Sequence, residues 1–432
     1  MDPVSIGVIS LVSLTLFLMS GVRIAFATAL CGFFGLWILR GYDPAAALSA
    51  QTVIGHVTNY NLLVLPLFIM MGFFAYYANI TRDIYWAARQ WLGHLPGGLA
   101  VATVIGCAGF AAACGASTAS AAVMGRVALP ELKKFGYDDK VSTGCVAAGG
   151  TMAIMIPPSV LIVIYGFIAE ESIGALLLAG ILPGLLQAAS YVAMLLIRFK
   201  LNPDLGQPVR GITWRERFSS LKGIWGMMVI ILLVMGSMYT GLATPTEAAG
   251  IGALGALVMA IPRLNFREFA GSMMETIRTT ALIFAIVAGV LIFVHFLGFT
   301  GTPAAIANGI AGMDVSPTVI LICILAFYLL LGMFIDGIGM VLLTVPILLP
   351  TIKHLGIDPI VFGILVVRMV EIGLMTPPVG LNVYVLKGVA KDVSMGDIFR
   401  GCGWFVVVDI INVAILVAFP QIILLLPQTM SK

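Results

Sequence analysis

Four short segments of small, hydroxyl-bearing and proline residues interrupt the apolar stretches of this 432-residue chain. They are Cys114–Ser120, Gly149–Ser159, Gly332–Gly339 and Glu371–Asn382. Two of the segments contain Pro157-Pro158 and Pro377-Pro378, and tandem prolines break a helix because they remove N–H donors and clash with the preceding turn. Freed carbonyls and hydroxyls suit Na⁺, whereas the N-termini of half-helices suit an anion.

The oxygen-bearing residues and glycines of these segments predict one sodium site in each half of the chain. The first half supplies Gly115, Ser117, Thr118, Ser120, Gly149, Gly150, Thr151, Pro157 and Ser159. The second half supplies Gly332, Asp336, Gly337, Glu371, Gly373, Thr376, Pro377 and Asn382. We expect no metal beyond sodium and no organic cofactor, because the six cysteines form no CxxC pair and the four histidines have no ligand-like spacing.

A substrate carboxylate is expected between the two sites, and some charged residues allow two interpretations. The predicted substrate contacts are Ser117, Ser120, Ser159, Arg368, Thr376 and Asn382. Arg368 and Glu371 share one helical face, so Arg368 either pairs with Glu371 or contacts the substrate. Asp336 either caps a half-helix or binds a cation. Glu247 and Asp409 are either buried intramembrane acids or helix-end residues.

The composition identifies a polytopic membrane protein. Charged residues make up 10% of the chain and hydrophobic residues 60%, against about 25% and 45–50% in soluble domains. A disordered chain, a coiled coil and a secreted disulfide scaffold are excluded, and the lipid bilayer is an expected partner. The net charge of +3, without a long basic run, excludes nucleic-acid binding. No basic segment precedes Arg23, so we expect the first apolar run to remain as a span.

The most polar segment is 198–222, which has six cations against two acids. The positive-inside rule places it in the cytoplasm, as a linker with amphipathic character. The same rule places the segments 81–94 and 131–140 in the cytoplasm. Asp83–Trp86 and Trp91 predict an amphipathic helix that lies along the membrane surface.

An internal repeat divides the chain. Pro157-Pro158 and Pro377-Pro378 lie 220 residues apart, and the same offset relates Asp138 to Asp358. We predict a first repeat over 1–197 (hairpin 96–130, broken helix 141–170), the linker 198–222, and a second repeat over 223–432 (hairpin 316–350, broken helix 360–390). The matching loops differ in charge, so the repeats are expected to be inverted, with about ten transmembrane helices plus two re-entrant hairpins in an all-α fold. Such architecture is typical of secondary transporters.

Several motifs, spread over nearly the whole length of the chain, resemble those of a known family. They include Leu65-Pro66-Leu67-Phe68, Gly97-Gly98-Leu99-Ala100, Ile156-Pro157-Pro158-Ser159, Gly356-Ile357-Asp358-Pro359 and Thr376–Asn382. Together they resemble the large permease subunit of tripartite ATP-independent periplasmic (TRAP) transporters. Two departures are Arg23, where a proline is common, and Arg368, which is not expected throughout the family.

The resemblance implies sodium-coupled import of an organic acid anion, such as a C4-dicarboxylate or sialic acid, across the bacterial cytoplasmic membrane. It also implies a small four-helix membrane subunit, a periplasmic substrate-binding protein, and an elevator motion of a transport domain against a scaffold domain. We expect the small subunit to be a separate chain.

Two other classes of protein are alternatives to this interpretation. A stand-alone citrate- or dicarboxylate-type symporter, or a sodium/proton antiporter, of the same broad fold is the main alternative. An intramembrane enzyme is disfavoured, since no His/Glu metal motif and no Ser–Lys dyad lies in a plausible span. No Walker-type loop is present, which agrees with ion coupling instead of ATP hydrolysis.

Overall fold

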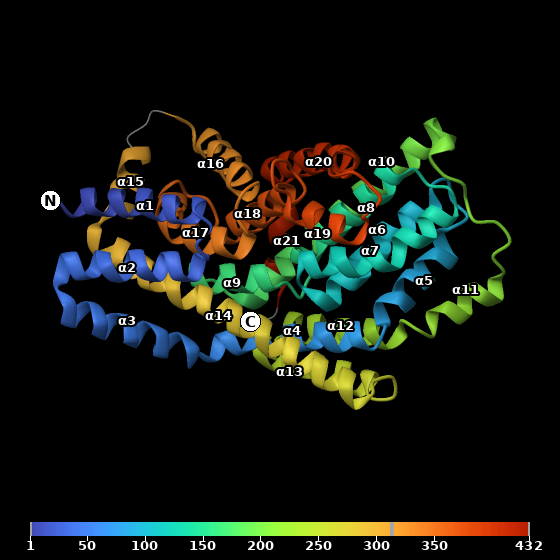
Figure 1. Ribbon diagram of the computed structural model, residues 1–432, viewed down its shortest axis with the longest axis horizontal. Coiled ribbons are helices and arrows are strands. Elements are labelled where there is room, and N and C mark those ends of the chain that lie inside the picture. The colour runs from blue at the N-terminus through green and yellow to red at the C-terminus, as the bar shows by residue number, and fades with distance from the viewer. Residues whose placement is uncertain (1, 312–314, 431–432) are drawn as a thin grey trace.

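The computed structural model describes residues 2–311 and 315–430. Every regular element within these ranges is a helix, so the all-α prediction is confirmed. Helices α1–α3 gather at one end of the elongated molecule, and α5, α10 and α11 at the other (Figure 1).

The first part of the chain contains two pairs of short helices that are separated by irregular breaks. Its elements are α1 Pro3–Met19, α2 Ile24–Arg40, α3 Tyr42–Val57, the 3₁₀ turn η1 Tyr60–Leu63, α4 Val64–Tyr77, α5 Ile80–Leu92, α6 Gly98–Cys114, α7 Ser117–Lys134, α8 Asp139–Thr151, η2 Met152–Ile154, α9 Val160–Ala169 and α10 Ile173–Leu201. The pair α6–α7 occupies the segment for which a hairpin is predicted, and α8–α9 the segment for which a broken helix is predicted.

The rest of the chain repeats this pattern after a short polar connection. Its elements are η3 Pro203–Leu205, α11 Trp214–Leu221, α12 Trp225–Tyr239, α13 Pro245–Ala260, α14 Phe266–Thr300, α15 Thr302–Ala311, α16 Pro317–Gly332, α17 Gly337–His354, α18 Pro359–Leu374, α19 Leu381–Val389, α20 Met395–Ala418 and α21 Gln421–Thr429. Here α16–α17 is the helix pair with a tight tip, and α18–α19 is the broken pair.

Side-chain caps fix where the broken helices begin. Asp138 accepts a hydrogen bond from the Val141 N–H at the start of α8, and Asp358 accepts one from the Ile360 N–H at the start of α18. Such caps satisfy N–H groups that the first helical turn leaves unpaired. The two aspartates are related by the repeat, so matched residues start matched helices.

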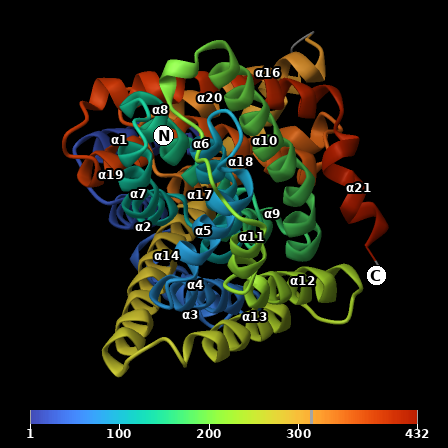
Figure 2. The same ribbon diagram turned by 90° about the vertical axis from the view of Figure 1, so that its right-hand side faces the viewer.

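Two groups of helices face each other across the molecule. The 35-residue helix α14 packs against α2 and α4, and α4 packs against α13. In the other group, α8 packs against α6, α7 and α20, and α16 packs against α18. Figure 2 shows α3, α4, α13 and α14 below the helices α7, α8, α18 and α20. This arrangement puts both helix tips near the boundary between the groups.

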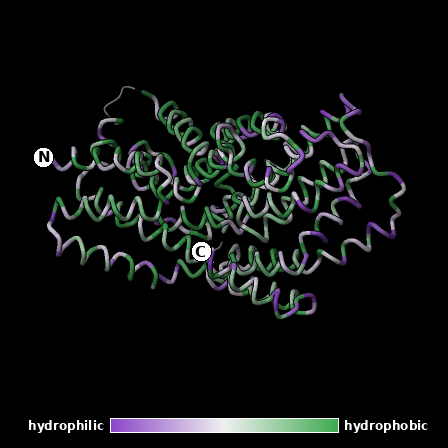
Figure 3. The backbone as a smooth tube through the Cα atoms, viewed as in Figure 1, coloured by the Kyte–Doolittle hydropathy of each residue, from purple (hydrophilic) through white to green (hydrophobic). Residues whose placement is uncertain are grey.

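Apolar helices dominate the centre of the molecule (Figure 3). Within the described residues, five helical segments are long and apolar enough to cross a membrane, and six if the bent pair α11–α12 is taken as one span. Six further apolar helices have 10–17 residues. The count of about ten spans stays a prediction.

Candidate functional site

The first tip joins α6 to α7 through only two residues, Gly115 and Ala116. Gly115 has φ +62°, and a Cβ there would lie 2.8 Å from the Pro158 carbonyl oxygen. A glycine is therefore required for two reasons. The backbone is left-handed at this position, and the first break lies too close for a side chain. The tip thus packs directly on the break of its own half.

Hydroxyl groups around the first break bond mainly to their own backbone. Ser159 caps α9 by accepting from the Ile162 N–H at 3.3 Å, and it donates to the Ile154 carbonyl at 2.5 Å. Thr151 donates to the Ala148 carbonyl at 2.7 Å. The buried Ser120 hydroxyl, in contrast, has no hydrogen-bond partner among the described residues. Ser120 is the hydroxyl that is free to bind a ligand.

The second tip carries an acid in place of hydroxyls. Asp336 caps α17, since its Oδ2 accepts from the Gly339 N–H at 3.2 Å, and its side chain remains exposed. Just before this tip, α16 touches α18 backbone to backbone: a Cβ on Gly373 would lie 2.5 Å from the Gly332 carbonyl carbon. The second tip is therefore also fixed against the break of its own half.

A hydrogen bond links the first tip to the second break. The Ser117 hydroxyl donates to Asn382 Oδ1 at 2.8 Å, and the Asn382 amide donates to the Ala147 carbonyl at 3.2 Å. Thr376 at the same break bonds to the Ile372 carbonyl at 2.5 Å. This bond therefore joins the two halves through residues that are 265 positions apart in the chain.

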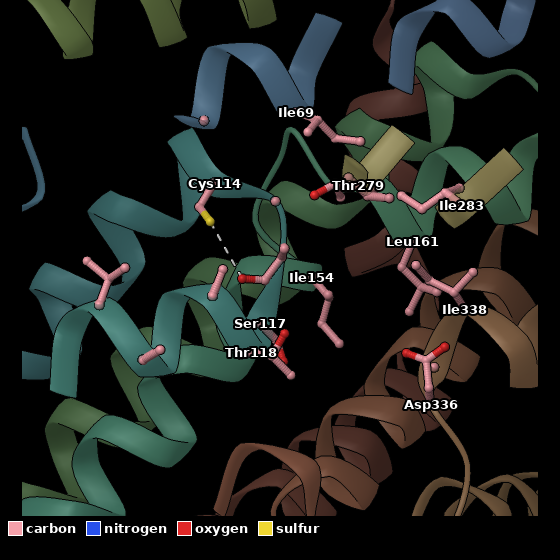
Figure 4. A pocket seen from close by; sticks show the side chains of 18 of the residues that line it. Ile69, Cys114, Ser117, Thr118, Ile154, Leu161, Thr279, Ile283, Asp336 and Ile338 are labelled. Atoms are coloured by element: carbon pink, nitrogen blue, oxygen red, sulfur yellow. Dashed lines mark hydrogen bonds between the residues drawn. The ribbon is translucent and has the colours of Figure 1, made fainter. Parts of the chain in front are cut away.

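A cavity of about 470 Å³ lies between the two tips. Its polar lining comes from Ser117, Thr118, Arg126, Thr279 and Asp336. Figure 4 shows Ser117 and Thr118 on one side, Asp336 and Ile338 on another, and Ile69, Thr279 and Ile283 closing the space. Oxygen atoms, two helix N-termini and one guanidinium therefore border a mostly apolar space, which is typical of a small-molecule site.

Comparison with known proteins identifies the family. The model of the tripartite ATP-independent periplasmic transporter DctM component matches residues 11–422. The chain belongs to this family. The C4-dicarboxylate TRAP transporter large permease protein DctM of Pseudomonas aeruginosa is 32% identical over 376 residues, covering 86% of this chain and 87% of that protein. The sialic acid TRAP transporter large permease protein SiaM of Vibrio cholerae is 32% identical over 383 residues, covering 88% and 89%.

Two solved structures share the fold. The YdaH transporter of Alcanivorax borkumensis aligns with a TM-score of 0.65 at 13% identity over 88% of this chain and 89% of that one. MtrF of Neisseria gonorrhoeae aligns with a TM-score of 0.58 at 14% identity over 96% and 95%. Membership of the TRAP permease family makes this chain a multi-pass protein of the bacterial inner membrane and not an enzyme, as the sequence predicts.

Behind the second break, the TRAP permease buries a network of charges. The Arg368 guanidinium bonds to Glu371 through Nη1 and to Asp409 Oδ1 through Nη2, the latter at 2.5 Å. Tyr191 donates to Asp409 Oδ2 at 2.6 Å. The three charged side chains are fully buried. Arg368 therefore pairs with Glu371, as its spacing favours, and with a second acid on another helix.

The two other uncertain acids differ from each other. Glu247 lies at the start of α13, where it forms a capping box with Thr244. Asp409 lies in the middle of α20 and is buried. Glu247 is thus a helix-end residue, and Asp409 is a buried intramembrane acid.

The predicted site residues fall into two sets. The cavity is lined by Gly115, Ser117, Thr118, Asp336 and Gly337. The described cavity lining does not include Ser120, Gly149, Gly150, Thr151, Pro157, Ser159, Gly332, Arg368, Glu371, Gly373, Thr376, Pro377 or Asn382. These residues form the tips, breaks and network behind the cavity wall.

Sequence reasoning missed two polar residues of the lining, Arg126 and Thr279. Arg126 is the first charged residue after the first tip, which is a signal that the sequence did offer. Thr279 lies on α14, far from either repeat motif, and nothing in the sequence points to it.

Proposed function

We propose that this TRAP permease imports an organic acid anion with sodium as the coupling ion. The observation that carries the proposal is the cavity between the two tips, where cation-binding oxygens and anion-binding helix N-termini border one space. Family membership supports transport, and the chemistry of the tips supports the choice of ion and of substrate charge.

The residues present fit Na⁺ as a transported ion. Ser120 has a buried hydroxyl without a partner, and Asp336 has an exposed carboxylate in the cavity. Oxygen ligands of these kinds suit a hard cation. The breaks after α8 and α18 add carbonyl groups that no longer bond within a helix. One sodium site per half remains the simplest arrangement.

The residues on the opposite sides of the cavity fit a carboxylate. Helix α7 begins at Ser117 and α17 at Gly337, and both first residues line the cavity. Helix N-termini attract anions through unpaired N–H groups and the helix dipole. Arg126 adds a full positive charge. A bound cation near Asp336 would neutralise the one acid that opposes an anionic substrate.

The walls of the cavity support an elevator mechanism. One wall consists of the two tips, and the other is formed mostly by apolar side chains of α4 and α14, such as Ile69 and Ile283, with Thr279 among them. Smooth apolar surfaces offer few hydrogen bonds that would have to break when one group of helices slides along the other. We infer that the tip-bearing helices move and that α4 and α14 belong to the fixed scaffold.

The partners follow from the family. We infer that a small four-helix membrane subunit and a periplasmic binding protein work with this chain. Relatives are named for C4-dicarboxylate, sialic acid and ectoine. A carboxylate is the group that these substrates share, and it is the group that the tips are suited to bind.

Uptake into proteoliposomes that contain the chain and both partner proteins tests this proposal. Uptake should require an inward Na⁺ gradient, and the double variant Ser117→Ala, Thr376→Ala should lose most of it. The Glu275→Gln variant, which changes a surface acid on α14, is the matched control and should transport normally. Uptake that is indifferent to the Na⁺ gradient would falsify the coupling, and normal uptake by the double variant would refute the side-chain assignment.

A further inference from the structure

The linker folds back along an amphipathic helix. The Val209 N–H donates to the Gly93 carbonyl at 2.8 Å, and the Trp91 indole N–H donates to the Arg217 carbonyl at 3.1 Å. Helix α11 therefore packs along α5, as Figures 1 and 2 both show. It is bent by 47° from the apolar helix α12, and only the two helices together are long enough to count as a candidate span. We call the pair α5 and α11 the interfacial arm.

Aromatic side chains cover the outer face of the interfacial arm. Trp214 and Phe218 are stacked with ring centroids 6.3 Å apart, and Trp91 lies 5.8 Å from Phe218. Trp214 is 65% exposed and Phe218 60% exposed. Large aromatic side chains exposed on a bent helix beside a span are typical of the membrane–water interface.

Arg217 lies on this aromatic face, and neither it nor the other cations of residues 210–222 have a described acidic partner. Arg217 lies over the Trp214 ring at 4.7 Å, and its buried Nε has no hydrogen-bond partner among the described residues. No described carboxylate is within salt-bridge distance of Arg210, Arg215, Arg217 or Lys222. Glu216 is held by the backbone and hydroxyl of Thr213, which lower its pKa and keep it turned to the helix start.

Several other cations of the predicted cytoplasmic loops are paired with acids. Arg89 is 3.4 Å from Glu131, Lys140 is 3.6 Å from Asp397, and Arg263 is 2.5 Å from Asp83. The excess positive charge of the linker therefore has no acidic partner among the described residues, whereas these other cations do.

We propose that the interfacial arm binds the headgroup of an anionic phospholipid of the cytoplasmic leaflet. The phosphate lies against Arg217 and its neighbouring cations, and the upper acyl chains lie on Trp214 and Phe218. A lipid fits better than a soluble anion, because the exposed rings beside the cations would otherwise contact water. Basic clusters next to spans attract anionic lipids by about 1 kcal/mol per cation, a factor of about five.

The test uses the purified full chain in nanodiscs of equimolar phosphatidylglycerol and phosphatidylcholine, with native mass spectrometry of the retained lipids. The wild-type chain should retain mainly phosphatidylglycerol. The Arg217→Gln variant should reduce this preference about fivefold, and the variant R210Q/R215Q/R217Q/K222Q should abolish it. W214A/F218A, which keeps every charge, should also weaken retention, and its thermal unfolding midpoint checks that it is folded.

The matched control is K133Q/K140Q/R263Q/R400Q, which removes the same number of cytoplasmic charges from cations that have acidic partners. It should keep the wild-type preference. Equal retention of both lipids by the wild-type chain would overturn the proposal, and so would an equal loss in the control variant. Displacement of the lipid by millimolar inorganic phosphate would also overturn it, because the site would then bind phosphate alone.

Discussion

At the first break, Ser159 and Thr151 bond to the neighbouring backbone, and every side chain of the break is uncharged. The second break has the same backbone interruption, with Glu371 and Arg368 in the helix just before it. Under the repeat offset of 220 residues, Arg368 matches Ala148 and Asp336 matches Ala116. Both halves therefore share the broken backbone, and only the second break has charged side chains beside it.

The positions of these charges suggest a division of roles. Arg368 pairs with both Glu371 and Asp409 in a dry interior, where an unpaired charge is costly. They hold α18 to α20 and, through Tyr191, to α10. Asp336 instead faces the cavity. We infer that the network positions the second break, whereas Asp336 acts on transported species.

Of the variants that test this comparison, Arg368→Met should lower the stability of the protein most. It leaves Glu371 and Asp409 buried without their cation, and breaking a buried ion pair in this way costs about 3–5 kcal/mol. We expect a strongly lowered thermal unfolding midpoint in detergent.

A triple variant separates the charge from the packing. R368M/E371Q/D409N removes all three charges together, so it should recover most of the stability that R368M loses. If the triple variant is as unstable as R368M, charge pairing is not how the network stabilises the protein. The proposed difference between the two halves, with charges at the second break only, would then have no role in stability.

Gly373→Ala should have the next largest effect. The added Cβ would lie 2.5 Å from the Gly332 carbonyl carbon, and overpacking of this kind costs about 1–3 kcal/mol. The repeat places Ala153 at the matching first-half position, so only the second half requires a glycine here. Gly388→Ala in α19, where a Cβ meets nothing within 4 Å, is the control and should not lower the unfolding midpoint. Equal midpoints for both variants would contradict the close contact.

The sequence predicts the places where the helices break, and it predicts less of what surrounds them. Tandem prolines act locally, so both breaks are visible in the chain, as is the pairing of Arg368 with Glu371. Asp409 is different, because it reaches the network from α20, and a contact between helices leaves no spacing pattern. The bond between Ser117 and Asn382 is hidden for the same reason. Local chemistry was therefore predictable, and contacts between helices far apart in the chain were not.

The serines of the first site offer a smaller and more selective test. Ser120→Ala removes a buried hydroxyl without a partner, so stability should be unchanged while the Na⁺ concentration for half-maximal uptake rises. Ser159→Ala removes a helix cap and should cost about 1 kcal/mol of stability. The unfolding midpoint and the Na⁺ dependence of uptake are measured for both. The opposite assignment, with S120A unstable and normal in Na⁺ dependence, would mean that Ser120 is structural.

Asp392→Asn should change the unfolding midpoint least, because it removes an exposed ion pair between the halves. Lys133 on α7 donates to Asp392 before α20, and this bond lowers the pKa of Asp392. A lowered folded pKa stabilises the protein above the usual aspartate value of about 3.9, and the contribution disappears as the pH falls further. Wild type should therefore unfold slightly above D392N at pH 7, and the two midpoints should converge at acidic pH. Asp204→Asn on the linker, an acid outside any described ion pair, is the control. If the midpoints of wild type and D392N still differ at acidic pH, Asp392 acts through its shape instead of its charge. The contact between Lys133 and Asp392 would then join the halves without an electrostatic contribution.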